Sequence, residues 1–264
     1  MRLTVLVENT AGSAALQCVH GLSFYLEAAG KRILFDMGPG AQFAQNAQAL
    51  GVALDAVDFA VLSHGHYDHG GGLDVFLRRN DHAPVYLRPG AFAPHTDQAG
   101  HDIGLRPALQ KSPRLKVTDA SCEIAPGVRL FSQVQGRKFW SPLNEELLEG
   151  GVPDPFSHEQ SLLVEEDGRL VLIAGCAHCG MVNILERAAE IAGRLPDVAV
   201  GGMHLAVGTA APDDFVRALA RQLKSYPCKF YTCHCTGAHP FALLKETLGE
   251  QLAALTGGDR VTLS

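Results

Sequence analysis

A histidine-rich segment in the first quarter of the chain restricts the fold more than any other feature. The sequence SHGHYDHGGG follows an apolar run, Phe59–Leu62, that is typical of a buried strand. Residues two apart in an extended chain point the same way, so His64 and His66 can bind one metal ion. Asp68 and His69 then face a second ion. The surrounding glycines let the backbone turn tightly where a Cβ would clash, so the segment predicts a metal site at a strand end.

Two more histidines follow predicted strands in the second half of the chain. His178 lies in GCAHCG after the strand Arg169–Ala174, and His234 lies in CHCTG after the strand Lys229–Thr232. Reactive groups of open α/β sheets gather outside the carboxyl ends of strands, so we expect the three segments to meet at one edge. Cys176 is a further candidate ligand, because a thiolate suits zinc.

The remaining pattern predicts an α/β chain in which each half begins with β-hairpin material and continues with α–β alternation. Further strands are expected at Leu3–Val7, Ser23–Glu27, Arg32–Asp36, Val85–Leu87, Ser161–Glu165 and Val198–Val200, and helices at Leu73–Arg79, Val182–Ala192, after Pro212 and around Phe241–Leu252. Residues 88–157 are rich in Pro and Gly and predict a flexible cover or insertion, with strand candidates near 115–117 and 128–132. No linker separates the halves, so residues 1–264 are expected to form a single domain.

Composition argues against two classes of partner. The 264 residues carry 22 Lys and Arg against 28 Asp and Glu, a net charge of −6, without a dense basic cluster that would bind nucleic acid. No apolar stretch is long enough to cross a bilayer, and the first ten residues show no secretory signal. We therefore expect a cytoplasmic protein that binds neither nucleic acid nor a membrane. The sequence leaves open whether copies of the chain form a homo-oligomer.

The seven cysteines are an odd number, and five of them lie in the second half. Without an export signal, reduced thiols or metal ligands are expected rather than disulfides. One alternative to a histidine centre is a structural zinc site made by four thiolates, those of Cys176, Cys179, Cys233 and Cys235. That alternative leaves the HxHxDH segment unexplained.

The segments LFDMG and LSHGHYDHGGGL, together with the later strand-end histidines, resemble the metallo-β-lactamase superfamily. The resemblance covers most of the chain. It implies a four-layer αβ/βα sandwich with a metal site, commonly dinuclear, at one edge of the two sheets. The segments LVENTA, AGCAHCGMVNIL, GGMHL and CHCTG are similar to the branch that contains dihydropterin–ribofuranosylaminobenzene phosphate synthase, many of whose members are known only as metal-dependent hydrolases.

The resemblance implies these metal ligands: His64, His66, Asp68, His69, His178 and His234. In the superfamily a histidine usually precedes the hairpin and a bridging aspartate follows it. This chain instead has HEQ at 158–160 before the hairpin and CAH at 176–178 after it. Cys176 is a candidate for the place of the bridging carboxylate, and either His158 or Glu159 could supply the missing ligand. The sequence leaves these assignments open.

Other polar residues have two readings each. Asp36 could accept a hydrogen bond that fixes a histidine tautomer, or it could form a turn before Gly38. His204 in GGMHL is a candidate catalytic residue that touches substrate or donates a proton, or else a hydrogen-bonded core histidine. The remaining histidines show no partner pattern and are expected on the surface or in loops: His20, His82, His95, His101 and His239.

Three functions follow as hypotheses. The first is a hydrolase in which one or two zinc ions, or manganese or iron, lower the pKa of water to about 7 and polarise a phosphoryl or acyl oxygen. Asp68 would align the nucleophile, and family analogy favours a small anionic substrate such as a phosphoester. The second is a transferase that joins a pterin methyl diphosphate to a ribofuranosylaminobenzene phosphate acceptor. The third is a non-catalytic zinc-binding or sensing protein, which the second-half cysteines favour.

Overall fold

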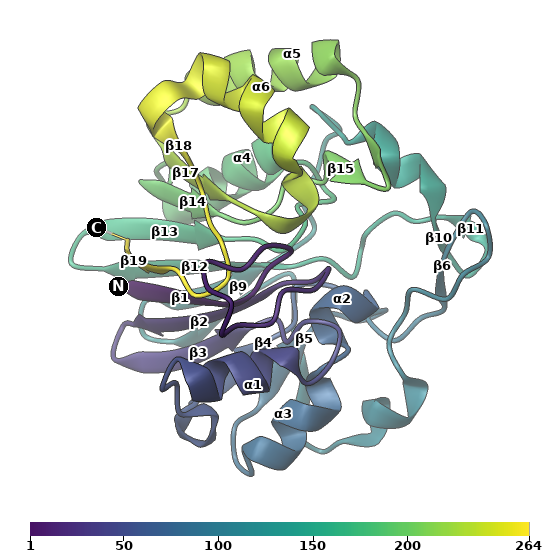
Figure 1. The fold of residues 1–264 in the computed structure, drawn as a ribbon, viewed down its shortest axis with the longest axis vertical. Coiled ribbons are helices and arrows are strands. Elements are labelled where there is room, and N and C mark those ends of the chain that lie inside the picture. Colours follow the sequence, from purple (N-terminus) through teal and green to yellow (C-terminus); the bar gives the residue numbers. More distant parts are fainter. Residues whose placement is uncertain (264) are drawn as a thin grey trace.

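Two seven-stranded sheets pack face to face, and helices cover their outer faces, which gives four layers (Figure 1). The computed structural model describes residues 1–263. The chain builds the first sheet, then the second, and returns with its last strand to the first sheet. This arrangement agrees with the predicted αβ/βα sandwich.

The first sheet has the order β19-β1-β2-β3-β4-β5-β7. Its strands are β1 (Arg2–Val7), β2 (Ser23–Ala28), β3 (Lys31–Phe35), β4 (Phe59–Val61), β5 (Val85–Leu87), β7 (Leu115–Val117) and β19 (Arg260–Thr262). Ala29 and Gly30 both have positive φ, 51° and 67°, as a two-residue hairpin turn between β2 and β3 requires. From β3 to β7 the neighbouring strands are parallel, so their carboxyl ends lie at one edge. Helices α1 (Gln42–Ala49) and α3 (Leu73–Arg79) cover the outer face.

The second sheet has the order β18-β17-β14-β13-β12-β9-β8. Its strands are β8 (Ser121–Ala125), β9 (Val128–Phe131), β12 (Ser161–Glu166), β13 (Arg169–Ile173), β14 (Val198–Val200), β17 (Lys229–Thr232) and β18 (Leu252–Ala254). The predicted hairpin is confirmed, with Asp167 and Gly168 at φ 53° and 74° in the turn between β12 and β13. From β13 to β18 the strands are parallel. Helices α4 (Met181–Ala192), α5 (Asp213–Lys224) and α6 (Ala238–Leu248) cover this sheet.

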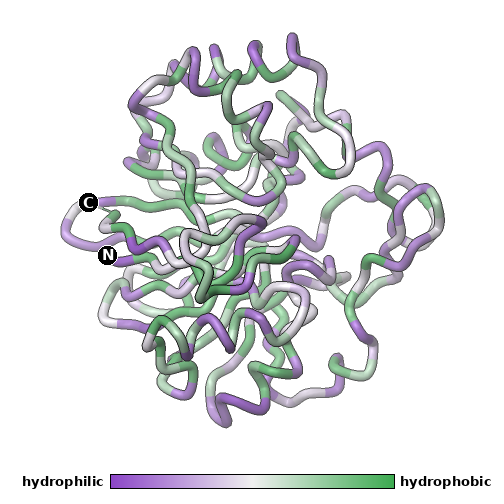
Figure 2. The backbone as a smooth tube through the Cα atoms, viewed as in Figure 1, coloured by the Kyte–Doolittle hydropathy of each residue, from purple (hydrophilic) through white to green (hydrophobic). Residues whose placement is uncertain are grey.

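The core between the sheets consists of the inward-facing side chains of their strands. Phe24 and Ile33 of the first sheet and Val164 and Ile173 of the second have no solvent exposure and belong to one apolar cluster. Burial of each such side chain contributes about 1.5–3 kcal/mol, which holds the two parallel-strand edges in register. Figure 2 shows the apolar stretches along the central strands and the hydrophilic residues on the outer helices.

Residues 88–157 contribute to both sheets and to a small separate sheet. β7, β8 and β9 belong to the large sheets, whereas β6 (His95–Asp97), β10 (Leu147–Glu149) and β11 (Val152–Pro153) form a three-stranded side sheet, at the right of Figure 1. The remaining elements are short: α2 (Tyr67–Gly70), β15 (Ala206–Val207), β16 (Thr209–Ala210) and 3₁₀ turns at Leu54–Ala56, Pro107–Lys111, Pro142–Glu146, His234–Thr236 and Gly249–Gln251. The side sheet brings residues of this stretch beside the histidine loops.

One predicted element is wrong at its end. The last helix was expected to reach Leu252, but α6 ends at Leu248, and Gly249 has a φ of 55°. Leu252 instead begins β18, an edge strand parallel to β17. Apolar residues in this segment fit both a helix and a strand, and the sheet edge decides between them. Among residues 1–263, no helix combines the length and hydropathy of a membrane span.

Candidate metal centre

Three loops meet where the parallel strands of the two sheets end. The loop after β4 carries the HxHxDH segment, the loop after β13 carries Cys176 and His178, and the loop after β17 carries His234. All these ligand candidates are buried. The chain turns from extended backbone into α2 after His66, so Asp68 and His69 project from a single helical turn. The structure therefore brings the three predicted segments together at one edge.

The candidate ligand atoms form two groups that share one sulfur. His64, Cys176 and His178 each offer a ligand atom within 4.8 Å of the others, and so do His69, Cys176 and His234. His69 Nε2 lies 3.1 Å from Cys176 Sγ and 3.2 Å from His234 Nε2. Asp68 Oδ2 lies 3.2 Å from His234 Nε2. Cys176 therefore stands between two sets of nitrogen and oxygen ligands.

In the first half, Asp36 fixes the imidazoles. Its carboxylate accepts hydrogen bonds at 2.7 Å from His69 Nδ1 and from the Ser63 hydroxyl. Because the Ser63 hydroxyl donates to Asp36, its oxygen is left to accept from His64 Nδ1 at 2.8 Å. Both histidines thus carry a proton on Nδ1, and Nε2 is the atom that faces the centre. The tautomer-fixing role predicted for Asp36 is confirmed for its contacts.

In the second half, two asparagines serve the same purpose. His178 Nδ1 donates to Asn144 Oδ1 at 3.0 Å, while Asn144 Nδ2 donates to the His178 carbonyl at 2.8 Å, which fixes the amide orientation. His234 Nδ1 donates to Asn9 Oδ1 at 2.8 Å. Nε2 of His178 is buried and has no protein partner, and the same holds for His64. Imidazoles held at Nδ1 with free, converging Nε2 atoms are arranged as metal ligands are.

The residues present fit a transition-metal ion. Imidazole nitrogens, a thiolate and a carboxylate are the ligands of zinc sites, and manganese and iron accept imidazole and carboxylate ligands as well. With no ion, the buried Nε2 atoms of His64 and His178 would lose the hydrogen bonds that they make in water, which costs free energy. The centre is therefore built for one or more cations.

Sequence comparison decides the family. The profile of the metallo-beta-lactamase superfamily matches residues 16–213, which include the HxHxDH loop, Cys176 and His178. The chain belongs to the metallo-β-lactamase superfamily. Both the predicted resemblance and the predicted sandwich fold are thereby confirmed.

Two curated relatives come from Methanocaldococcus jannaschii. The chain is 27% identical to 7,8-dihydropterin-6-methyl-4-(beta-D-ribofuranosyl)-aminobenzene-5'-phosphate synthase, over 98% of this chain and 95% of the relative. It is 29% identical to the uncharacterized protein MJ0448, over 89% and 90%.

Solved structures give the same fold. Tm1679, a metal-dependent hydrolase of the β-lactamase superfamily, has a TM-score of 0.86 and 26% identity, over 100% of this chain and 99% of that one. The Zn(2+)-bound PqqB from Methylobacterium extorquens has a TM-score of 0.59 and 14% identity over the whole of both chains, which shows the fold alone.

The superfamily pattern is incomplete around the hairpin, and the structure shows what replaces it. Cys176 occupies the shared position between the two ligand groups. The Glu159 carboxylate instead accepts the backbone N–H groups of His178 and Cys179 at 2.7 and 2.8 Å, and burial raises its pKa. His158 Nε2 contacts Asp154 Oδ2 at 3.1 Å. Of the three residues considered for the missing place, only Cys176 faces both groups.

The alternative of a four-thiolate zinc site does not fit the geometry. Among residues 1–263, Cys176 and Cys235 share a group with His204, but no group contains four cysteines. Cys179 Sγ faces the Phe156 carbonyl, and Cys233 packs in the core between the sheets. The C-x-x-C and C-x-C spacings therefore do not correspond to one structural zinc site.

Asp68 lies at the wall of a pocket beside the centre. Its Oδ2 is 3.3 Å from His20 Nε2, a contact that the sequence analysis missed when it assigned His20 to the surface. Burial opposes ionisation of Asp68, but the neighbouring imidazoles outweigh it and hold its pKa well below the usual value. In turn Asp68 and Asp36 overcome burial and raise the pKa of His69 to about 9.

The pocket has a volume of about 310 Å³ and exposes both ligand groups. Its wall includes Tyr67, Asp68, Cys176, His178, His204 and His234, with Leu143 and Glu146 from the stretch that precedes β10. The His204 ring lies 4.1 Å from the His178 ring, and both of its nitrogens are buried without a hydrogen-bond partner. His204 is therefore not a hydrogen-bonded core histidine and is free to meet a ligand in the pocket.

Two buried carboxylates support the second-half loops, and the sequence analysis missed both roles. Glu8 Oε1 accepts the His234 N–H at 2.7 Å, and Glu159 holds the backbone at His178. These loops contain non-glycine residues with positive φ, Ala177 at 56° and His234 at 53°. Such backbone costs on the order of 1–3 kcal/mol per residue and persists only where contacts hold it. The one available signal was Glu8, which interrupts an apolar strand pattern.

Proposed function

We propose that this chain is a metal-dependent hydrolase that cleaves a small anionic substrate, a phosphoester, at the centre around Cys176. The observation that carries the proposal is the set of four imidazoles whose Nδ1 atoms are held by acceptors while their Nε2 atoms converge beside a pocket. Zinc in such a site supplies an acidified water and a concentrated positive charge. The ligands proposed for it are His64, His66, Asp68, His69, Cys176, His178 and His234.

Asp68 and His204 are the proposed catalytic residues. Asp68 is ionised at neutral pH because its pKa is depressed, so its carboxylate can orient a water through a hydrogen bond. His204 lies on the same pocket wall with both ring nitrogens free of protein partners, so it can donate a proton to a leaving group. Among the described residues that line the pocket, Asp97 and Glu146 are acidic and none is Lys or Arg. An anionic substrate would therefore depend on the bound ions and the histidines for its attraction.

The runner-up is a transferase, and one observation favours it: the chain matches a named phosphate synthase over nearly its whole length. In this version, the centre would hold a diphosphate leaving group while an arylamine acceptor attacks a pterin methyl carbon. Leu143 and Leu147 at the pocket wall would help to exclude water from that reaction.

The test uses the zinc-loaded chain with phosphomonoesters and phosphodiesters, and separately with a pterin methyl diphosphate with and without its acceptor. We expect hydrolysis that needs no acceptor. Product that forms only when the acceptor is present would replace the hydrolase by the transferase. Bound zinc without turnover in any arm would favour the non-catalytic zinc-binding hypothesis.

Two variants and a control sharpen the test. His204→Gln should keep its zinc and lose about 100- to 10,000-fold in turnover if the side chain is a general acid. Asp68→Asn should lose turnover as well. His239→Gln is the matched control, because His239 is exposed and lies outside the pocket. Equal turnover of wild type and His204→Gln would remove His204 from the catalytic set.

A further inference from the structure

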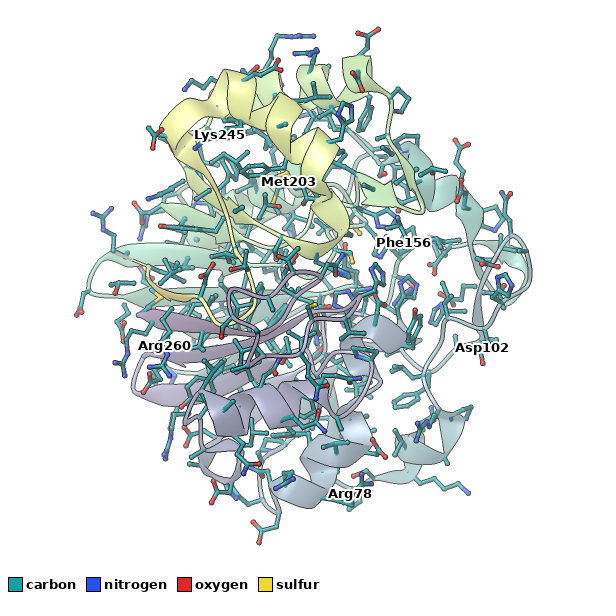
Figure 3. The ribbon with its side chains drawn as sticks, in the orientation of Figure 1. Arg78, Asp102, Phe156, Met203, Lys245 and Arg260 are labelled. Atoms are coloured by element: carbon teal, nitrogen blue, oxygen red, sulfur yellow. The ribbon has the colours of Figure 1, made fainter. Side chains whose placement is uncertain are left out.

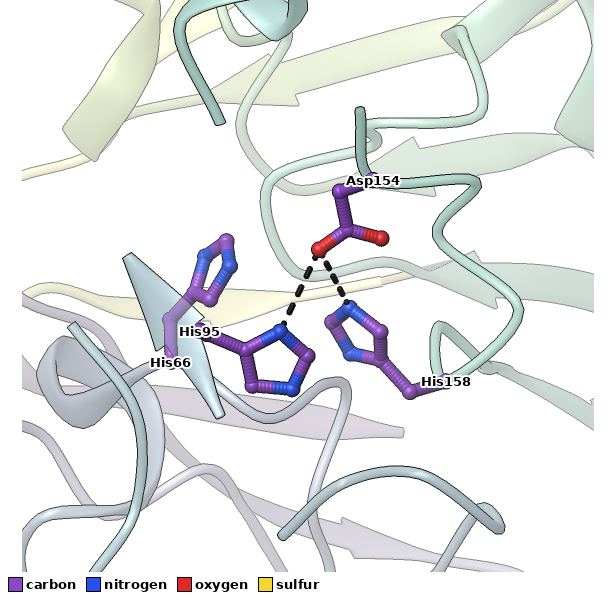
Figure 4. Close-up of side chains that lie close together, drawn as sticks. All are labelled: His66, His95, Asp154 and His158. Atoms are coloured by element: carbon purple, nitrogen blue, oxygen red, sulfur yellow. Dashed lines mark hydrogen bonds and ion pairs between the residues drawn. The ribbon is translucent and has the colours of Figure 1, made fainter. Parts of the chain in front are cut away.

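A second cluster of metal-ligating side chains lies beside the Cys176 centre. His66, His95, Asp154 and His158 each offer one ligand atom, all four atoms lie within 4.8 Å of one another, and all four residues are buried (Figure 4). His95 begins β6, and Asp154 and His158 follow β11, so three members come from the side-sheet region. The sequence analysis expected His95 in a surface loop. That expectation is wrong, since the His95 side chain has no solvent exposure.

The hydrogen bonds of the cluster leave two lone pairs facing each other. Gly65 N–H donates to His158 Nδ1 at 3.0 Å, so His158 turns its Nε2 to Asp154 Oδ2. His95 Nε2 lies 3.2 Å from the Gly90 carbonyl, which can only accept, so the neutral ring has its proton on Nε2. His95 Nδ1 then presents a lone pair to the same Asp154 oxygen at 3.3 Å and has no hydrogen-bond partner. A cation between these atoms would turn the repulsion into attraction.

The distances match those around a tetrahedral ion. Ligand bonds of about 2.0–2.1 Å place neighbouring ligand atoms of a tetrahedron about 3.3–3.4 Å apart. The two contacts of Asp154 Oδ2, with His158 Nε2 and His95 Nδ1, measure 3.1 and 3.3 Å. His66 adds a buried Nε2 that has no hydrogen-bond partner.

The charge balance also requires a cation. Among residues 1–263, the ion-pair partners of Asp154 are His95 and His158, and its side chain has no solvent exposure. A buried carboxylate without a compensating charge is costly, whereas a divalent ion offsets it and satisfies the imidazoles at the same time. Three imidazoles and one carboxylate are ligands that zinc accepts.

We propose that His66, His95, Asp154 and His158 form an additional site for a single zinc-class ion, separate from the centre around Cys176. Because Gly65 and His66 belong to the HxHxDH loop, this ion would join the side sheet to the loop that carries the ligands of that centre. The site does not depend on the proposed hydrolysis, since it concerns how many ions the folded chain binds.

The first test is metal content. The full-length chain is saturated with Zn²⁺, freed of excess metal by gel filtration and analysed by inductively coupled plasma mass spectrometry. His95→Gln and His158→Gln should each carry one zinc ion per chain fewer than the wild type. His101→Gln, a change at an exposed histidine, should match the wild type. Circular dichroism and thermal melting verify that each variant is folded, and folded variants with the full wild-type content would overturn the proposal.

A second test needs no variant. Crystals of the wild-type chain grown with Zn²⁺ and measured at the zinc absorption edge should give an anomalous peak within about 2.0–2.2 Å of His95 Nδ1, Asp154 Oδ2 and His158 Nε2. No peak there, with full occupancy at Cys176, would mean that a proton and not a metal ion lies between His95 and Asp154. Failure of the hydrolase proposal would show as missing turnover, which neither test reads.

Discussion

The two halves of the molecule supply ligands to the Cys176 centre in different ways. The first half delivers His64, His66, Asp68 and His69 from one loop, and Asp36, at the end of the neighbouring strand, orients two of their rings. The second half delivers its ligands from two loops. Their supports, which include Asn144 and Glu159, come from distant parts of the sequence.

The most distant of these supports cross between the halves. Glu8 and Asn9 follow the first strand of the first sheet, yet they hold the backbone and ring of His234, about 225 residues away. The first-half ligands are therefore preorganised by neighbouring strands, whereas the second-half ligands take their places only when both sheets have packed. The comparison predicts that changes in the first half act mainly on the ligands themselves, and changes in the second half on their orientation.

The largest effect is expected for a ligand of the first half. His69→Ala removes an imidazole that contacts both Cys176 and His234, so the variant should lose at least one zinc ion per chain and all measurable turnover. Metal analysis and the phosphoester assay measure the two losses. His82→Ala, at an exposed histidine, is the control. A variant with wild-type zinc content would contradict the central place of His69.

The second prediction concerns the metal-free chain and pH. The pKa of His69 is about 9 in the folded protein, above the ordinary value of 6.5, because Asp68 and Asp36 favour its charged form. A raised folded pKa stabilises the fold fully below the unfolded value, and this stabilisation is lost as pH rises from 6.5 through about 9. The contribution is roughly 3 kcal/mol. Urea unfolding in the presence of a chelator should show the loss, and His69→Gln should show less of it.

The third prediction tests the support of the first half. Asp36→Asn keeps one acceptor oxygen but replaces the other by an amide donor, so it cannot accept from His69 and Ser63 as the carboxylate does. Zinc affinity should fall by about 100-fold, the upper end for residues that orient metal ligands. Competition with a chromophoric chelator measures it. An affinity within twofold of wild type would mean that the loop is rigid without Asp36.

The smallest effect is expected in the second half. Asn144→Ala removes the acceptor of His178 Nδ1, but Glu159 still holds the backbone at that residue. Zinc affinity should therefore fall by about 10-fold, the lower end for such residues. The same competition assay applies. A larger loss than in Asp36→Asn would reverse the contrast between the halves.

Sequence reasoning reached the first half of the site more fully than the second. The four polar residues of the HxHxDH segment lie within six positions after an apolar strand, so periodicity and spacing were enough to bring them together. The hairpin at Asp167 and Gly168 was equally local. The end of α6 was not, because pairing with β17 turns an ambiguous apolar stretch into β18.

The missed residues share one property: their partners are far away in the chain. Asn9, Asn144 and Glu159 gain their roles only through contacts with loops from other elements. His20 and His95 looked isolated because Asp68 and Asp154, their partners, cannot be recognised from spacing. His82, His101 and His239 are exposed or largely exposed, as predicted.

Phe156, labelled in Figure 3, connects the side sheet to the centre. Its ring stacks on His178 with centroids 4.3 Å apart and an angle of 3°, and it also lies 6.4 Å from His66. This residue precedes His158 by two positions, so the same short segment contacts both clusters. A change in the side sheet is therefore transmitted to the ligands through packed rings as well as through Asp154.

Sulfur at the shared position has a chemical consequence of its own. The carboxylate that superfamily members usually carry there is inert to peroxide, whereas a cysteine thiolate can be converted to sulfenic acid and beyond. Such oxidation would remove the only ligand common to both groups. Preparations handled in air should therefore lose function with time, and a thiol reductant should restore it only while damage has not passed the sulfenic stage.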